Sequence, residues 1–402
     1  MRLLILFSLF CTLGISSHAQ QVQYGVRPFF LIDAMQPSEL RDKLSSCKNQ
    51  VPSRSYFSIA HRGAPLFFPE HTVESLAAAN LMGAGIFECD VTFTKDKQLV
   101  CRHAQNDLHS TTNILKTGLA KKCTRPFVPS NENSDAVADC RTTDLTLEEF
   151  QSLKGKMDGF NPKAKTINEY MDSIPSWRSN LYVNNGGTVL THRQSIELIK
   201  SFGGKFIPEL KLPIVPVPFE GFSHRDFAQA LINEYKEVGI PPKDVFPQSF
   251  YLPDILYWIE NEPEFGKQAI LLDDGSAQFG FDPDKLGDLN HRMHQLYLAG
   301  VRYIGSPIWI LLTLDENNEI IPSSYARAAK ANNLKIIAWS LERDGPLISG
   351  GGWYHQSIKR VLRDDSQVYL VLDVLARKVG VSGVFSDWPA TVTYYANCMQ
   401  IE

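Results

Sequence analysis

The sequence has no Cys-x-x-Cys pair, no cluster of basic residues and, after its first 19 residues, no apolar run long enough to cross a membrane. Structural zinc is commonly bound by closely spaced cysteine pairs, and because this sequence has none, a zinc site is not indicated. With 40 Lys and Arg against 44 Asp and Glu, the net charge of −4 argues against nucleic acid or another polyanion as a partner. These absences leave a mildly acidic protein with no stable membrane span and no evident protein partner.

The chain opens with a segment typical of export. Residues 1–19 contain Arg2, an apolar stretch of about a dozen residues and small residues before the expected cleavage point at Ala19. A membrane anchor is the alternative, but an anchor needs about 20 consecutive apolar residues. We therefore predict a signal peptide over residues 1–19 and a secreted protein, either extracellular or periplasmic.

Six cysteines follow the predicted signal peptide, and an even number in an exported chain permits disulfides. A Cys123–Cys140 bridge is the first predicted pair, because these residues flank a polar loop. A Cys47–Cys398 bridge is the second, and it would tie the two ends of the chain together. Cys89 and Cys101 fall inside expected strands, a position more typical of buried thiols.

Apolar, β-rich runs alternate with helical patterns from residue 57 onward. Eight runs are candidate barrel strands: 57–60, 86–92, 206–211, 245–250, 269–273, 302–305, 335–341 and 383–387. Helical patterns lie between many of them: 226–238, 252–261, 288–299, 323–332 and 367–379. Alternation of strand and helix predicts a parallel sheet, and eight repeats predict an α/β fold of the (β/α)8 TIM-barrel type.

The chain is longer than the about 250 residues of a typical TIM barrel. We predict a lead-in over residues 20–55, with a helix near residues 37–46, and a barrel domain over residues 56–402. The run 98–103 is expected to form an extra hairpin strand after the second barrel strand. Residues 104–205 are too long for one connection, so we interpret them as an inserted cap region, with a passive, disulfide-pinned loop as the alternative.

Four ionisable side chains lie close together in the first part of the barrel sequence. Glu88 and Asp90 are two residues apart on one strand, so they share a face. Paired carboxylates repel each other unless a cation lies between them, and a hard divalent ion suits oxygen ligands. His61 and His103 each follow an apolar strand and could form an acid–base pair. An isolated Glu-x-Asp more often marks a solvated strand face. Here the two histidines nearby in the sequence indicate a functional site instead.

A second carboxylate-bearing strand is expected further along the chain. Glu209 and Lys211 share one face at the carboxyl end of the third candidate barrel strand, where catalytic groups of TIM barrels lie. Taken alone, a Glu-x-Lys pair is usually a surface ion pair.

Six short motifs occur in a fixed order over some 50 residues: His61-Arg62-Gly63, Pro69-Glu70-His71-Thr72, Glu88-Cys89-Asp90-Val91, Thr94-Lys95-Asp96, Arg102-His103 and Thr111-Thr112. In this order they make the sequence resemble the glycerophosphodiester phosphodiesterase family, in its larger, exported branch. Two positions depart from the family pattern. Ala104 stands where the family often has an acidic residue, and Asn113 stands where it often has Asp.

The resemblance implies a reaction and a role for each of nine residues. The reaction is hydrolysis of a small-molecule glycerophosphodiester, such as glycerophosphocholine, to glycerol 3-phosphate and an alcohol. The implied cofactor is one divalent cation, Ca²⁺ or Mg²⁺. The implied residues are the metal ligands Glu88, Asp90 and Glu209, the base His61, the acid His103, and the substrate contacts Arg62, Lys211, Gln248 and Trp339.

Two other functions fit the same barrel. One is phospholipase D-like or lyase activity on lipid phosphodiesters, which predicts an exposed apolar rim around the site. The other is a non-catalytic binding barrel, against which the presence of both histidines and all three carboxylates argues. Because a fold constrains function only loosely, the choice of substrate stays open at this point.

Overall fold

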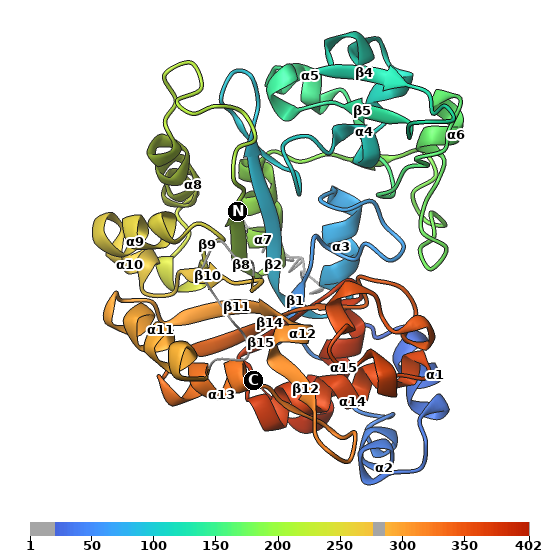
Figure 1. Ribbon diagram of the computed structural model, residues 1–402, viewed down its shortest axis with the longest axis vertical. Coiled ribbons are helices and arrows are strands. Elements are labelled where there is room, and N and C mark those ends of the chain that lie inside the picture. Colours follow the sequence, from blue (N-terminus) through green and yellow to red (C-terminus); the bar gives the residue numbers. More distant parts are fainter. Residues whose placement is uncertain (1–20, 276–285, 402) are drawn as a thin grey trace, which may run out of the picture.

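The structure of the protein is a computed structural model that describes residues 21–275 and 286–401 (Figure 1). The predicted signal peptide, residues 1–19, lies outside the described residues. Among the helices that are described, none has both the length and the apolar character needed to span a bilayer.

Eight parallel strands form a closed barrel at the centre of Figure 1. In order around the barrel they are β1 (Ser55–Ala60), β2 (Ala84–Phe93), β8 (Lys205–Leu210), β9 (Gln248–Ser249), β10 (Ile270–Leu272), β11 (Tyr303–Pro307), β14 (Lys335–Leu341) and β15 (Gly383–Ser386). β15 pairs with β1, which closes the ring. The predicted TIM barrel is therefore confirmed, and each predicted strand overlaps an observed one.

The alternation of side chains along each strand divides the apolar residues between two cores. Phe87 and Cys89 on β2 point outward into the large core between strands and helices. Ile86, in the opposite register, joins a small cluster of barrel-interior side chains. Glu88 and Asp90 share the inner face with Ile86, because residues two apart on a strand point the same way. The two carboxylates therefore face the inside of the barrel.

An outer layer of helices covers the strands. Its members are α3 (Val73–Leu81), α7 (His192–Phe202), α8 (His224–Val238), α9 (Leu252–Asn261), α11 (Leu286–Leu298), α13 (Ser324–Ala331), α14 (Val368–Asp373) and α15 (Pro389–Met399). The ends of α8 show why they form where they do. Ser223 and Asp226 make a reciprocal capping box at its start, and Gly239 ends it in the left-handed conformation. All five helices predicted between barrel strands are present. Four have ends within two residues of the prediction, and the one predicted over 367–379 is α14 continued by a π-helix over Val374–Val379.

The lead-in packs beside the C-terminal helix. It contains α1 (Arg27–Ala34), which the sequence patterns do not predict, and the predicted α2 (Glu39–Ser46). Both contact α15, and the Tyr394 hydroxyl donates a hydrogen bond to the Leu44 carbonyl. The predicted Cys47–Cys398 disulfide is confirmed. In Figure 1 the blue lead-in and the red C-terminal helix lie side by side.

The segment between β2 and β8 contains the predicted insertion. The predicted hairpin strand is confirmed, because β3 (Leu99–Cys101) pairs antiparallel with β2. Beyond β3 the chain forms a lobe with its own apolar core and the predicted Cys123–Cys140 disulfide. Its elements are α4 (Leu108–Thr111), β4 (Arg125–Val128), β5 (Val137–Asp139), α5 (Leu147–Gln151), β6 (Lys154–Gly155), α6 (Ile167–Met171) and β7 (Gly187–Thr188).

The remaining short elements lie on connections of the second half of the barrel. They are α10 (Pro263–Gly266), α12 (Ile308–Leu311) and the hairpin of β12 (Leu312–Leu314) and β13 (Ile320–Pro322).

Candidate functional site

Three buried carboxylates meet at the carboxyl end of the barrel. Asp90 on β2 lies directly beside Glu209 on β8 in the sheet register. Ligand oxygens of Glu88, Asp90 and Glu209 all lie within 4.8 Å of one another. Oδ1 of Asp90 and Oε1 of Gln248 are buried and accept no hydrogen bond from the described residues. Oxygen atoms gathered in this way, with lone pairs left over, fit a hard divalent cation.

The electrostatics of these carboxylates support the same conclusion. Burial and the neighbouring Asp90 raise the pKa of Glu88 well above its ordinary value. Burial raises the pKa of Glu209 to about 8, although Lys211 Nζ lies 2.5 Å from its carboxylate and opposes the shift. The pKa of Asp90 stays well below its ordinary value, because Lys211 and His71 outweigh its burial. A cation among the three would favour the ionised form of all of them.

His61 follows β1 and is held by Asp387, the residue directly after the neighbouring strand β15. Its Nδ1 lies 2.6 Å from Oδ1 of Asp387, and its Nε2 lies 3.9 Å from Oε2 of Glu88. Because Asp387 accepts the proton on Nδ1, the neutral ring presents the lone pair of Nε2 towards the carboxylates. Burial and Arg62 lower the pKa of His61 to about 4, so the ring is neutral at physiological pH.

Sequence patterns give no role to Asp387, the residue that orients His61. The side chain is buried and also contacts Arg178 at 3.2 Å and Arg343 at 3.4 Å. Arg178 comes from the inserted lobe, so the insertion contributes directly to the surroundings of His61. The signal that could have found Asp387 is its place as the last residue of the eighth predicted strand run, 383–387.

Arg62 and Gly63, in the His61-Arg62-Gly63 motif, form a tight bend directly after β1. Arg62 has a φ of 55°, and its backbone N–H donates to Glu88 at 2.9 Å. A Cβ on the following Gly63, which has a φ of 100°, would lie 2.3 Å from Oγ of Ser75. The guanidinium of Arg62 contacts Glu70 at 3.1 Å and Asp90 at 3.4 Å. These contacts fix a permanent positive charge beside the carboxylates.

His103 follows β3 on a tightly anchored segment. The backbone N–H of the preceding Arg102 donates to the Asp90 carbonyl at 2.8 Å. The buried guanidinium of Arg102 donates to the carbonyls of Glu70 and His71, both at 3.1 Å. Burial, together with nearby cationic side chains, lowers the pKa of His103 well below its ordinary value.

One cavity of about 160 Å³ collects the predicted site residues. Its lining includes His61, Arg62, Glu88, His103, Glu209, Lys211, Gln248 and Trp339, together with Phe250, Leu272, Tyr354 and Phe385. Asp90, the ninth predicted residue, contacts the lining through Arg62 and Lys211. Gln248 donates to Oε1 of Glu88 at 3.2 Å. Residues predicted on or directly after six different strands (β1, β2, β3, β8, β9 and β14) therefore lie around a single space.

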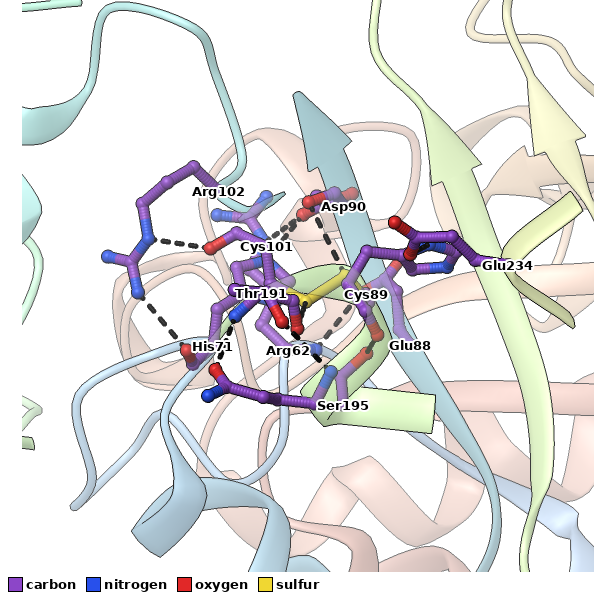
Figure 2. The surroundings of a disulfide bond; sticks show 12 residues. Arg62, His71, Glu88, Cys89, Asp90, Cys101, Arg102, Thr191, Ser195 and Glu234 are labelled. Carbon is purple, nitrogen blue, oxygen red and sulfur yellow. Dashed lines mark hydrogen bonds and ion pairs between the residues drawn. A yellow bond between two sulfur atoms is a disulfide. The ribbon is translucent and has the colours of Figure 1, made fainter. Parts of the chain in front are cut away.

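The prediction that Cys89 and Cys101 are free buried thiols is wrong, because they form a disulfide. The antiparallel pairing of β3 with β2 brings their Cα atoms to 5.3 Å, a normal distance for a bridge. Residue periodicity places each cysteine in a strand but does not show that the two strands are neighbours. Figure 2 shows the bridge between Glu88 and Asp90 on one side and Arg102 on the other. The disulfide thus links the strand of the carboxylates to the segment of His103.

Similarity to known sequences extends over most of the chain. The model of the "Glycerophosphoryl diester phosphodiesterase family" matches residues 61–273. A protein of Arthroderma benhamiae described as "Extracellular protein" is 44% identical over 249 residues, which cover 61% of this chain and 100% of that protein. The glycerophosphodiester phosphodiesterase of Haemophilus influenzae is 27% identical over 354 residues, covering 83% of this chain and 87% of that enzyme.

Comparison with solved structures supports the fold. A putative glycerophosphoryl diester phosphodiesterase from Silicibacter pomeroyi superposes with a TM-score of 0.55 at 15% identity, covering 89% of this chain and 98% of that one. The family match begins at His61 and includes His103 and all three carboxylates, whereas the lining residues Trp339, Tyr354 and Phe385 lie beyond it. The chain belongs to the glycerophosphoryl diester phosphodiesterase family, and it is an enzyme of that family.

Proposed function

We propose that the protein is an exported, metal-dependent phosphodiesterase that hydrolyses glycerophosphodiesters, such as glycerophosphocholine, to glycerol 3-phosphate and an alcohol. The observation that carries the proposal is the group of three buried carboxylates, two of which line one cavity together with two histidines and two cationic side chains. Export is supported by three disulfides, which form and persist in oxidising compartments, and by the extracellular relative.

Glu88, Asp90 and Glu209 would hold the metal, a single Ca²⁺ or Mg²⁺. When bound, a divalent cation neutralises charge on a phosphoryl oxygen and lowers the pKa of an adjacent water or hydroxyl group. Gln248 steadies Glu88 through its hydrogen bond and leaves its own buried Oε1 free to accept a further contact.

Arg62 and Lys211 would bind the anionic phosphodiester. The guanidinium of Arg62 presents a planar fork that matches phosphate oxygens, whereas Lys211 acts as a point charge. An ion pair with a carboxylate holds each side chain in place: Arg62 pairs with Glu70, and Lys211 pairs with Glu209. Their positive charges offset the negative charge that would otherwise repel an incoming nucleophile.

His61 would act as the base and His103 as the acid. Asp387 holds the proton on Nδ1 of His61, so Nε2 accepts the proton of the attacking hydroxyl group. His103 donates a proton to the leaving alkoxide. Burial lowers the pKa of His103 in the free protein, and Arg62 and Lys211 lower it further. A bound phosphate would offset these two positive charges and so favour the protonated ring. The nucleophile is either water or the 2-hydroxyl of the glycerol, which would give a cyclic phosphate first.

Cleavage of lipid phosphodiesters is a second candidate. The loop after β8 exposes Leu212, Ile214 and Val217, directly beyond the cavity residue Lys211. Exposed apolar side chains near a mouth of this kind are what a lipid substrate would contact.

Removal and return of the metal tests the proposal. The mature chain stripped of metal should not release glycerol 3-phosphate from glycerophosphocholine, and Ca²⁺ or Mg²⁺, added separately, should restore release. Glu88→Gln should lose this response because it removes one ligand charge, whereas Glu132→Gln, at an exposed position in the lobe, should keep it.

Two results would contradict the metal site: full turnover by the stripped enzyme, or wild-type turnover by Glu88→Gln. Lack of turnover with either ion would overturn the proposed substrate class and favour lipid phosphodiesters.

A further inference from the structure

The cavity has two chemically different walls. The charged and histidine side chains come from β1, β2 and β8 and from the segment after β3. The other wall is built by Phe250, Leu272, Trp339, Tyr354 and Phe385, none of which carries a charge. A phosphodiester seated on the charged wall therefore directs one of its substituents towards aromatic rings.

Three of these rings form a corner. Trp339 lies at its centre, and the ring of Phe250 is 5.9 Å away at 86° to the indole plane. The ring of Tyr354 is also 5.9 Å from Trp339, at 77°. Because all three side chains line the same cavity, two near-perpendicular rings flank the indole around a common space.

Trp353 extends the corner to the surface. Its ring stacks on Trp339 at 5.8 Å and 26°, and it meets Tyr354 edge-on at 5.1 Å. The side chain is 42% exposed, so the aromatic surface continues from the cavity to solvent. We call Phe250, Trp339, Trp353 and Tyr354 the aromatic corner.

The loop that carries Trp353 and Tyr354 is built for one conformation. Gly350, Gly351 and Gly352 all have positive φ values, of 93°, 65° and 62°. A Cβ on Gly352 would lie 2.4 Å from Cβ of Asp344, so a larger residue does not fit. The Trp353 backbone N–H donates to Asp344 at 2.8 Å. The two rings are therefore held in place before a ligand arrives, which reduces the entropy that binding costs.

We propose that the aromatic corner binds a quaternary ammonium group of the leaving alcohol, which makes choline esters the preferred substrates. This inference rests on the proposed function. Aromatic faces attract cations, and a quaternary ammonium has no N–H group that requires an acceptor. A primary ammonium does need acceptors, but the carboxylates that line the cavity among the described residues, Glu88 and Glu209, belong to the proposed metal group.

A neutral substrate of the same shape separates charge recognition from simple apolar contact. The glycerol phosphodiester of 3,3-dimethylbutanol replaces the nitrogen of choline by carbon. The wild-type enzyme should show a kcat/KM roughly 2- to 30-fold higher for glycerophosphocholine than for this ester. Trp339→Leu and Trp353→Leu should each bring the ratio towards one. Tyr251→Leu, which removes an exposed aromatic ring outside the cavity lining, should leave the ratio unchanged.

A wild-type ratio of one or less would overturn the inference, as would a ratio that both tryptophan variants retain. Calorimetric titration with choline and with 3,3-dimethylbutanol gives a readout that needs no turnover, and choline should bind more tightly unless Trp353 is replaced. If the enzyme hydrolyses both esters but shows no preference in either measurement, the aromatic corner does not recognise the ammonium charge, and the proposed function still stands. A protein that binds choline at the corner but hydrolyses neither ester refutes the proposed function instead.

Discussion

Replacing His61 by alanine is expected to lower kcat/KM for glycerophosphocholine by about 10²–10⁴-fold, the usual contribution of a positioned acid or base. The expected loss follows from the pairing with Asp387, which directs Nε2 of His61 towards the carboxylates. Asp387→Asn should lower the rate as well, because an amide can stabilise the wrong tautomer of the ring. Steady-state kinetics with saturating metal would measure both losses.

His103→Ala should show a loss that depends on the leaving group. Choline is a poor leaving group and needs a proton, so turnover of glycerophosphocholine should fall by a similar factor. A p-nitrophenyl ester needs no proton on its leaving group and should be affected far less. His291→Ala, at an exposed position on α11, serves as the control for loss of an imidazole. Near-wild-type turnover of glycerophosphocholine by His103→Ala would show that His103 is not the acid.

Two of the three disulfides should differ in what they support, one mainly stability and the other activity. In the chain-entropy treatment, loss of the Cys89–Cys101 bridge, with a separation of 12 residues, costs about 3 kcal/mol. Loss of the Cys47–Cys398 bridge, with a separation of 351, costs about 5–6 kcal/mol. Urea unfolding of the two double-alanine variants should therefore show the larger loss of unfolding free energy at the Cys47–Cys398 bridge.

Activity should follow the opposite order. Cys89 lies between Glu88 and Asp90 and is only 2% exposed, and its partner Cys101 is two residues from His103. Removing this bridge loosens both segments, so kcat/KM should fall roughly 10- to 100-fold, as for other supports of a metal site. The Cys47–Cys398 variant, assayed where it is folded, should retain its rate, because that bridge joins the two ends of the chain. Full activity of the Cys89–Cys101 variant would contradict the positioning role.

The barrel was predictable because its signal is local and repeated. Each strand is a short apolar run, and a helical pattern follows most of these runs. The Glu88-x-Asp90 alternation indicates which side chains of the second strand face inward. The lead-in helix α1 was not predictable in the same way. It is only eight residues long, and tertiary packing stabilises it, because Leu31 and Ile32 are buried in the main core.

The contacts around the candidate site depend on tertiary structure that no local pattern reports. Arg178 of the lobe and Arg343 after β14 meet at Asp387, although the three residues are far apart in the sequence. The Cys89–Cys101 bridge likewise requires knowledge of which strands pair. The sequence could thus indicate the groups that bear the chemistry, but not the groups that hold them in position.

The most direct test of this account is phosphorus-31 NMR of glycerophosphocholine incubated with the metal-loaded enzyme. The substrate resonance should disappear while that of glycerol 3-phosphate grows, and a transient cyclic phosphate would identify the glycerol 2-hydroxyl as the nucleophile. Formation of phosphocholine, which requires cleavage of the other ester bond, would contradict the account, as would an unchanged spectrum.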